Sequence, residues 1–566
     1  MDVLPYSVFF ADGGLSLLKT YPLYPLYPLV SLVRVQASLP SLHDNTADID
    51  RLKSVVAEAL PKELRGCSVH IPFTCMAKIA ASFRTAGFRG YALLQYEADR
   101  LVLVEFFAKA PELLPALALD LGSTHLEASL LDLLTGKTLA RSTNLNRQVE
   151  YGTDILTRIH FTARQEAGRN GLEVLQDAVI LSIHELLDQL CREVEIRPQD
   201  VLATAISGNT TMVHLLLGLN PQHICREPYI PLVNAPDLFL AREIGLKLHE
   251  QATVRVLPGK GSYFGGDLIA GILATGLDQA EKTSMLIDVG TNAEVVMGNS
   301  DWLIACAGAA GPALEGGVAR MGMRASSGAV EHVAIDHERW QLSWRSIGDS
   351  PPSGLCGSGL IDLVAELYLA RIVDLRGKFQ ATFPGQSAAH KRFVEERLLA
   401  MDGDGEQVFL VVAAGEAGNA EPVVLSQLDL DAMMRSKAAM YAILVTLIGQ
   451  VGVEFSELAR IAVAGAFGKH INPRQAITLG MLPDLPLSTF EPVGNSSLRG
   501  AEMVLLDHTT FERSKEIARK ITYIELNVNQ EFMIRFSGSR FIPHTDPGLF
   551  PSVPSFREGD ETVLFI

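Results

Sequence analysis

Ala116-Leu-Ala-Leu-Asp-Leu-Gly-Ser-Thr124 and Ser284-Met-Leu-Ile-Asp-Val-Gly-Thr-Asn292 decide the fold, because each is an apolar run that ends in aspartate, glycine and hydroxyl or amide residues. A second apolar run follows each one, at 126–131 and at 293–297. Two apolar runs joined by a short turn with glycine predict a β-hairpin. Since this hairpin opens two consecutive stretches, we expect a duplicated α/β fold with a cleft between its two halves.

Each predicted turn has the chemistry to bind phosphate. Glycine leaves backbone N–H groups accessible, and a neighbouring hydroxyl adds a donor. Asp120 and Asp288 end the two strands, where a carboxylate can hold Mg²⁺ through water, so both are candidate catalytic and metal-binding residues. Either turn alone is more often a plain hairpin turn, and only the matched pair indicates a nucleotide. The other phosphate-binding candidates are Gly122, Ser123, Thr124, Gly290, Thr291 and Asn292.

The paired turns resemble those of the superfamily that contains acetate and sugar kinases, heat-shock chaperones and actin. The resemblance implies two duplicated ribonuclease-H-like subdomains around a nucleotide cleft, with ATP and Mg²⁺ as cofactors. In this superfamily a strand and a glycine-rich turn cradle the adenosine. Ala459-Arg-Ile-Ala-Val-Ala-Gly-Ala-Phe-Gly468 fits that pattern, ahead of a helix-like run at 473–479. The adenosine-binding candidates are therefore Gly465, Ala466, Phe467 and Gly468.

Two further candidates each have two interpretations. Asn209 follows the strand-like run that begins at Ala205, and it either lines the cleft or has only a structural role. Glu315, in Gly311-Pro-Ala-Leu-Glu-Gly-Gly317, could orient an attacking water as a catalytic residue. The alternative for Glu315 is a helix-start carboxylate stabilised by backbone amides. Both residues stay candidates for the site.

The chain before the first hairpin divides into two parts. Residues 1–37 form an N-terminal extension with the repeat Tyr21-Pro-Leu-Tyr-Pro-Leu-Tyr-Pro-Leu29, which favours polyproline II and therefore a linker or edge segment. A docking peptide for an aromatic groove is the alternative. Residues 38–112 predict a small α/β domain with a hairpin at 91–106. The two predicted subdomains then occupy 113–276 and 277–566.

The composition excludes several classes of protein. The 48 basic and 65 acidic residues give a net charge of -17, so we expect no binding to nucleic acid or to anionic membranes. The six cysteines are scattered and match no zinc or cluster spacing, so we expect reduced thiols, a cytoplasmic location and no iron–sulfur cluster in this chain. We also find no targeting segment and no apolar run that would span a bilayer.

Five further segments narrow the resemblance to one family. They are Ile287-Asp-Val-Gly-Thr-Asn-Ala-Glu294, Ala309-Ala-Gly-Pro-Ala-Leu-Glu-Gly-Gly317, Gly322-Met-Arg-Ala325, Cys356-Gly-Ser-Gly-Leu-Ile-Asp362 and Phe541-Ile-Pro-His544. These segments resemble the reductive activators of corrinoid proteins, over roughly residues 38 to 566. The resemblance implies an ATPase that drives the reduction of cob(II)alamin to cob(I)alamin in a partner, a corrinoid methyl-transfer protein.

The chain departs from this family in one respect. Members typically carry an iron–sulfur module, often an N-terminal ferredoxin domain, and residues 1–37 are too short to be one. We therefore expect either that a separate ferredoxin-like protein supplies the electron or that this member uses the nucleotide-driven conformational step for another purpose. Two other function classes stay open, a small-molecule kinase of the same fold and a nucleotide-binding regulatory scaffold. A homodimeric state also stays open.

Overall fold

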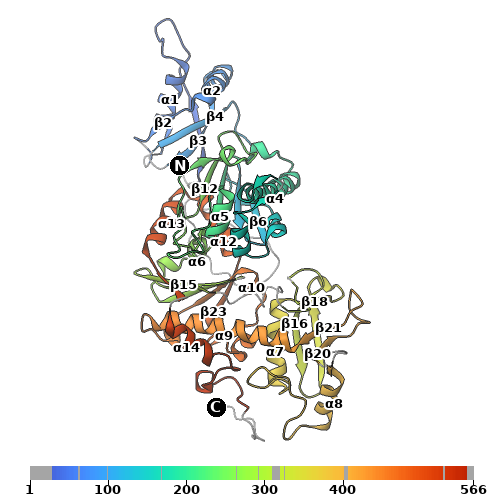
Figure 1. Ribbon diagram of the computed structural model, residues 1–566. Coiled ribbons are helices and arrows are strands. Elements are labelled where there is room, and N and C mark those ends of the chain that lie inside the picture. The colour runs from blue at the N-terminus through green and yellow to red at the C-terminus, as the bar shows by residue number, and fades with distance from the viewer. Residues whose placement is uncertain are drawn as a thin grey trace. The chain divides into compact units, whose positions relative to one another are not determined.

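The computed structural model in Figure 1 describes residues 28–556, except 62, 63, 65, 98, 99, 167, 263, 291, 309–318, 324, 401–405, 527 and 528. The side chains of Ala466, Phe467 and Lys469 are not described either, and the Tyr-Pro-Leu repeat lies outside the described residues up to Tyr27. The chain forms two compact units. Unit 1 contains the residues up to Ala274 and Ser497–Arg519, and unit 2 contains Thr275–Ser496 and the residues from Lys520 onward.

The first part of unit 1 is a small α/β layer with a four-stranded sheet in the order β1-β3-β4-β2. The hairpin expected at 91–106 is present as β3 (Arg89–Glu97) and β4 (Arg100–Phe107). Apolar side chains of the helices α1 and α2 pack on this sheet, among them Leu52, Val56, Ile79 and Phe83. The remaining elements are β2 (Ser68–His70), α1 (Asp48–Ala59) and α2 (Phe73–Thr85).

The strand β1 (Val30–Gln36) changes the expected start of this layer. We expected the small domain to begin at residue 38, but β1 pairs antiparallel with β3 along its whole length. Val30 and Val35 are buried there, so the sheet gains apolar contacts from residues that we had assigned to the N-terminal extension. The strand begins directly after Pro28 and Leu29, where the proline spacing ends.

The second part of unit 1 is a six-stranded sheet in the order β11-β12-β10-β5-β6-β7. β5, β6 and β7 are antiparallel neighbours, whereas β10 is parallel to β5 and β12 is parallel to β10. Leu175, Val179, Ile183, Leu186 and Leu190 recur at helical spacing on α4, and they are buried in the same core as this sheet. The strands are β5 (Pro115–Leu121), β6 (His125–Asp132), β7 (Lys137–Leu145), β10 (Ala203–Gly208), β11 (Phe239–Leu240) and β12 (Thr253–Val256), with a separate pair β8 (Gln165–Glu166) and β9 (Arg169–Asn170). The helices are α3 (Ile155–Phe161), α4 (Gly171–Val194), α5 (Thr210–Leu216), α6 (Gly266–Thr275), α12 (Ser496–Leu506) and α13 (His508–Lys520).

Unit 2 repeats this arrangement in a sheet of the order β23-β22-β13-β14-β15-β24. β13, β14 and β15 are antiparallel neighbours, β22 is parallel to β13, and β23 is parallel to β22. The strands are β13 (Ser284–Val289), β14 (Ala293–Gly298), β15 (Leu303–Gly308), β22 (Ile461–Ala464), β23 (Phe490–Gly494) and β24 (Ile521–Ile524). The same five-strand pattern in both units confirms the predicted duplicated ribonuclease-H-like fold and both predicted hairpins.

Unit 2 differs from unit 1 in the segment of chain between β15 and β22, the third and fourth strands of its large sheet. Two three-stranded sheets and several helices lie in this part of the chain. The strands are β16 (Ala329–Asp336), β17 (Gln341–Ser346), β18 (Gly354–Leu355), β19 (Leu398–Ala400), β20 (Gln407–Val412) and β21 (Val423–Ser426). The helices of unit 2 are α7 (Gly357–Leu369), α8 (Ala388–Arg397), α9 (Gln427–Gly449), α10 (Gly465–His470), α11 (Pro473–Thr478) and α14 (Gln530–Gly538).

The helix α9 is longer and more apolar than the sequence analysis expected. Among the described residues, α9 is long and apolar enough to cross a membrane, judged by length and composition only. Most of the helix is buried inside the structure, however. Its N-terminus is closed by a capping box between Ser426 and Asp429. These features are those of a core helix.

The segment Ser497–Arg519 departs from the expected boundary at residue 277, because it belongs to unit 1. Glu502 on α12 accepts hydrogen bonds from Ser129 Oγ and from the guanidinium of Arg141, each at 2.7 Å. A Cβ at Gly500 would lie 2.4 Å from the carbonyl oxygen of Ala270, so α12 and α6 cross in close contact. Polar contacts to the sheet and close packing on α6 thus hold this late segment in unit 1.

Candidate functional site

The first turn, between β5 and β6, is held in one conformation by its neighbours. A Cβ at Gly122 would lie 2.3 Å from the carbonyl oxygen of His125, so only glycine fits there. Asn146, directly after β7, supports the turn. Its Nδ2 donates to the carbonyl of Gly122 at 3.0 Å, and its backbone N–H donates to the carbonyl of Thr124 at 2.8 Å. The turn therefore presents a fixed backbone to a ligand.

Asp120 lies one residue before the end of β5 and has polar neighbours on both sides. Glu127 is directly opposite it on β6, and Ser207 is its partner on β10. Ser497 Oγ donates to Asp120 Oδ1 at 2.6 Å and also lies 2.6 Å from Ser207 Oγ. Carboxylate oxygens are ligands that Mg²⁺ accepts in proteins, so the position of Asp120 at the strand end is compatible with the metal-binding role expected from the sequence.

Asn209 is brought to the first turn by the strand β10. It is the N-cap of α5, where its Oδ1 accepts from the backbone N–H of Met212 at 3.0 Å. Its Nδ2 donates to Ser123 Oγ, also at 3.0 Å. The amide thus links the start of a helix to the hydroxyl of the turn, a contact that the sequence analysis had left open.

Asp267, which the sequence analysis did not select, lies next to Asn209. A Cβ at Gly265 would lie 2.4 Å from Asn209 Cα and 2.7 Å from Asp267 Oδ1, so both residues border the same point. The backbone N–H of Leu268 donates to Asp267 Oδ1 at 2.9 Å. Loss of solvent around the carboxylate raises the pKa of Asp267 to about 6.

The second turn repeats the position of the first in unit 2. Asp288 lies one residue before the end of β13, and Glu294 is directly opposite it on β14. The backbone N–H of Gly290 donates to the carbonyl of Asn292 at 2.8 Å. Thr291 lies outside the described residues. Both turns therefore place an aspartate against a glutamate on the next strand.

The segment predicted to bind adenosine begins a helix. We expected a glycine-rich turn at 465–468, but α10 starts at Gly465 directly after β22. Gly465 has φ +80°, and a Cβ there would lie 2.9 Å from Asp288 Oδ1 and 3.0 Å from the carbonyl oxygen of Val289. Gly468 packs on the carbonyl of Val463, where a Cβ would lie at 2.3 Å. The glycines are explained by this close packing of α10 on β13 and β22.

The residues that are described fit Mg-ATP without a preformed metal cage. Within the described ranges, no group of three or more His, Cys, Asp and Glu side chains is arranged to hold a metal ion. Mg²⁺ normally keeps several waters and uses one or two carboxylates together with substrate phosphates, so a single carboxylate such as Asp120 in unit 1 or Asp288 in unit 2 has the chemistry to hold it. Glu315 lies outside the described residues, as does the rest of its segment at 309–317.

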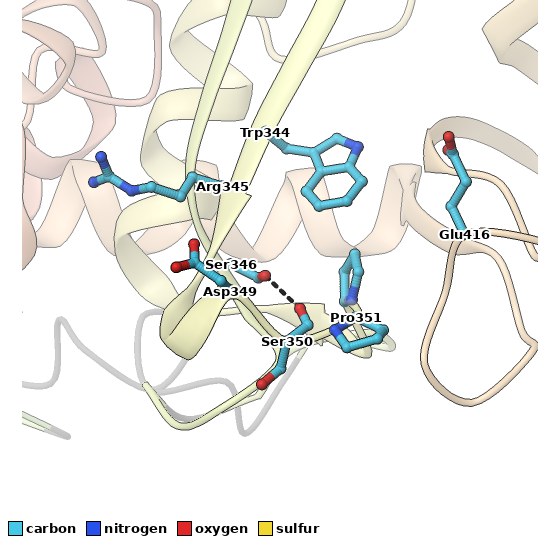
Figure 2. A pocket seen from close by; sticks show the side chains of 8 residues that line it. Trp344, Arg345, Ser346, Asp349, Ser350, Pro351 and Glu416 are labelled. Atoms are coloured by element: carbon cyan, nitrogen blue, oxygen red, sulfur yellow. Dashed lines mark hydrogen bonds between the residues drawn. The ribbon is translucent and has the colours of Figure 1, made fainter.

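A pocket in unit 2 lies apart from these residues. Figure 2 shows its lining, with the ring of Trp344 beside Pro351 and with Glu416 on the opposite wall. Its volume is about 370 Å³, and no predicted site residue is part of its lining. Arg345 at its edge donates to Glu331, which is also 3.4 Å from His470 at the end of α10.

Sequence reasoning missed Ser497, Glu127 and Asp267, for different reasons. Ser497 reaches Asp120 across 377 positions in the chain, and nothing near it in the sequence indicates this contact. The pairing of Glu127 follows from the hairpin register, which could have been counted from the turn. Asp267 follows two glycines between a strand and a helix, and that pattern could have been noticed.

Comparisons with known proteins cover nearly the whole chain. Residues 23–108, 115–280 and 282–554 match models described as the RACo linker region, the RACo middle region and the C-terminal domain of RACo, the ASKHA domain. The corrinoid activation enzyme RamQ of Eubacterium limosum is 31% identical over 418 residues, which are 74% of this chain and 68% of RamQ. The [Co(II) methylated amine-specific corrinoid protein] reductase of Methanosarcina barkeri is 24% identical, over 72% of each chain.

A solved structure agrees with these matches. The structure of a reductive activator for corrinoid, iron–sulfur protein is 35% identical, with a TM-score of 0.85. The match covers 95% of this chain and 82% of that one. Three regional matches in the right order, a curated relative above 30% identity and a shared fold lead to one conclusion: this chain belongs to the RACo family, with a linker region, a middle region and an ASKHA domain.

Proposed function

We propose that this protein is an ATP-dependent enzyme that reductively activates a corrinoid methyl-transfer protein, from cob(II)alamin to cob(I)alamin. One observation carries the proposal: the two matched aspartate–glycine hairpin turns occur in a chain that has all three RACo regions. Relatives with names that refer to corrinoid activation and corrinoid-protein reduction support it.

The roles that we propose follow from the chemistry of each segment. Backbone N–H groups and hydroxyls of the two turns bind the phosphates, and Asp120 and Asp288 hold Mg²⁺ through water. The start of α10 binds the adenosine. Such binding performs work only if nucleotide has different affinities for two conformations of the enzyme, since equal affinity shifts no equilibrium.

We also propose that a separate ferredoxin-like protein supplies the electron. Thiolates, and not thiols, are the ligands of iron–sulfur clusters. Burial raises the pKa of Cys191 to about 11 and also raises those of Cys75 and Cys306, so these groups favour the protonated form. We also propose a cytoplasmic location and a role in a methyltransferase system. The oligomeric state to test is a homodimer.

Calorimetric titration with Mg-ATP provides the first test. Asp288→Ala is expected to weaken ATP binding at least about 10-fold. The carboxylate and the phosphates are both negatively charged, so the carboxylate favours ATP binding only through a cation between them. Its removal should therefore cost about 1.4 kcal/mol or more of binding free energy. Asp301→Ala, an exposed aspartate in the same unit, is the matched control and should bind ATP as the unchanged protein does.

The second step of this test measures turnover. We expect ATP-dependent loss of the cob(II)alamin absorbance when a corrinoid protein and a reduced ferredoxin are added to the enzyme. Phosphoryl transfer from ATP to a metabolite would instead favour the small-molecule kinase. ATP binding with no turnover under any of these conditions would favour the regulatory scaffold, and absence of binding would refute the nucleotide site.

A further inference from the structure

The helix α3 carries a fully buried arginine inside unit 1. The side chain of Arg158 has no exposed surface, and its guanidinium contacts three different segments of the chain. Its Nε donates to the carbonyl of Gly152 at 2.8 Å, and its Nη1 donates to Gln148 Oε1 at 3.3 Å. The same Nη1 lies 3.3 Å from the sulfur of Met212 on α5. These contacts fix the guanidinium between the segment before α3 and the start of α5.

The contact with Gln148 connects Arg158 to the two ends of the first turn. The backbone N–H of Gln148 donates to Asn146 Oδ1 at 3.0 Å, and both side chains are fully buried. Asn146 in turn donates to the carbonyls of Gly122 and Thr124. A second bond, from Gln148 Nε2 to a backbone carbonyl of α4, keeps Oε1 directed at the guanidinium. Arg158 thus lies directly behind the first support of the turn.

The contact with Met212 connects Arg158 to the middle of the same turn. Met212 is fully buried, and its backbone N–H donates to Asn209 Oδ1 at 3.0 Å. Asn209 Nδ2 donates to Ser123 Oγ, also at 3.0 Å. One guanidinium therefore contacts both sets of residues that hold the turn, the first after β7 and the second at the start of α5.

Arg158 is charged in this place without an ion pair. Burial lowers the pKa of Arg158 to about 10, although the charge of Asp154 opposes this shift, so the guanidinium remains charged at neutral pH. Within the described part of the chain no carboxylate forms an ion pair with it, and its Nη2 has no hydrogen-bond partner. Burying a charge in this way opposes folding. The contacts with the two supports of the turn therefore explain this arginine better than stability does.

We propose that Arg158 is a positioning residue for the phosphates of ATP, because it holds both supports of the first turn in the conformation that binds them. This inference deepens the proposed function and rests on it, since it requires ATP at the first turn. The adenosine is assigned to the start of α10 in unit 2, which Arg158 does not support. Loss of Arg158 should therefore weaken the binding of the phosphates and leave the binding of adenosine unchanged.

The test is calorimetric titration of the full chain with Mg-ATP and, separately, with adenosine. Arg158→Met has a side chain of similar length without a donor. Its affinity for Mg-ATP should fall at least about 10-fold, because hydrogen bonds from a charged donor no longer hold the turn. Its affinity for adenosine should stay within about 3-fold, an outcome that a general loss of structure would not give.

Arg255→Met is the matched control in the same unit. Arg255 is also buried, and burial also lowers its pKa to about 10. It donates to the carbonyl of Tyr96, and its guanidinium lies 5.2 Å from the ring centre of Phe511, so its contacts do not include the supports of the turn. The affinities of Arg255→Met for Mg-ATP and for adenosine should both stay within about 3-fold of those of the unchanged protein.

Gln148→Met tests the same connection with Arg158 in place, and it decides the matter if Arg158→Met fails to fold. It should also lose affinity for Mg-ATP and not for adenosine, and unchanged affinity for Mg-ATP would then overturn the inference. The inference is equally overturned if Arg158→Met binds Mg-ATP as the unchanged protein does, if it loses affinity for both ligands in parallel, or if Arg255→Met shows the same selective loss. Those results would leave the proposed function intact, whereas failure of the unchanged protein to bind Mg-ATP would refute it and this inference with it.

Discussion

Gly208 is the last residue of β10 in unit 1, and Gly465 directly follows β22 in unit 2, so each glycine stands at the end of the strand that lies parallel to the first strand of a hairpin. A Cβ at Gly208 would lie 2.9 Å from the carbonyl oxygen of Leu121, and one at Gly465 would lie 3.0 Å from that of Val289. Leu121 and Val289 are the residues after Asp120 and Asp288. The duplicated sheet thus repeats this close backbone contact beside both candidate metal-binding carboxylates.

The side chains that support these repeated contacts are different. In unit 1 they are neutral: Asn209 follows Gly208 and bonds to Ser123, and Ser497 bonds to Asp120. In unit 2, Ala466 follows Gly465, and the helices beyond it are held by ionisable groups. His470 lies 3.4 Å from Glu331, and Gln475 on α11 donates to Glu366 at 2.6 Å.

This difference indicates which properties belong to the fold and which to each half. The glycine contact is a requirement of the fold, because β22 or β10 must lie close to the hairpin for a helix to start there. The supporting side chains are free to differ, so the support of α11 should depend on the ionisation of Glu366, whereas the hydrogen bond from Asn209 to Ser123 contains no ionisable group.

The largest expected effect comes from adding a methyl group to the repeated glycines. Gly465→Ala should destabilise unit 2 by about 2–4 kcal/mol, because the left-handed backbone costs roughly 1–2 kcal/mol and the contact with Val289 adds an overpacking cost of about the same size. Gly208→Ala has only the packing cost and should lose about 1–3 kcal/mol. Calorimetric unfolding of both variants measures the comparison.

Gly452→Ala isolates the backbone cost, since Gly452 has φ +63° and no atom within 4 Å of a Cβ built there. Its loss should be about 1–2 kcal/mol, with unchanged ATP affinity. Equal losses for Gly465→Ala and Gly452→Ala would mean that the contact with the carbonyl of Val289 contributes nothing, and the proposed equivalence of the two glycines would be wrong.

The ionisable support in unit 2 is tested at Glu366. Burial opposes the charged form of Glu366, but hydrogen bonds from His337, the N–H of Ile335 and Gln475 outweigh burial and hold its pKa below the ordinary value of 4.5. A carboxyl with a lowered pKa contributes stability above pH 4.5 and loses that contribution as the pH falls through its value in the folded state. Glu366→Gln should therefore cost about 2 kcal/mol at neutral pH and progressively less in acid.

The measurement is the unfolding temperature of the unchanged and variant proteins between about pH 3 and pH 7. Glu395→Gln is a suitable control, since Glu395 lies in an exposed pair with Lys391 at 3.8 Å and should contribute less than about 0.5 kcal/mol. A difference between Glu366→Gln and the unchanged protein that does not vary with pH would show that the support of α11 is not ionic.

Much of this architecture follows from local sequence. The two hairpins are predictable because Gly122 stands in a short turn between apolar runs, and the fold class follows from their recurrence. The start of α10 was not predicted, because glycine disfavours helices and Gly465 therefore indicates a turn. In the structure, the space beside Asp288 admits only a residue without a Cβ, and this packing outweighs the low helix propensity of glycine.

Contacts between distant segments account for the other differences. The strand β1 is short and follows a proline-rich repeat, so its pairing with β3 could not be inferred from composition. Ser497 and Glu502 lie in α12, which the sequence analysis assigned to the second half because of its position in the chain. Only the three-dimensional fold shows that this segment belongs to unit 1. The placement of Asn209 beside Ser123 was open in the sequence and is settled by the parallel register of β10 and β5.

The smallest expected effect concerns the neutral support in unit 1. Asn209→Ala removes an N-cap and the bond to Ser123, so it should destabilise the protein by about 1 kcal/mol at every pH at which the protein is folded. Asn170→Ala removes an N-cap of the same kind from α4, where Oδ1 of Asn170 accepts from the N–H of Leu172, and it should cost a similar amount. The two variants should differ in ATP affinity, because only Asn209 orients the hydroxyl of the phosphate-binding turn. Equal ATP affinities in calorimetric titration would mean that Asn209 serves α5 alone, and that the two halves of the duplicated fold differ in their support without differing in how they hold a ligand.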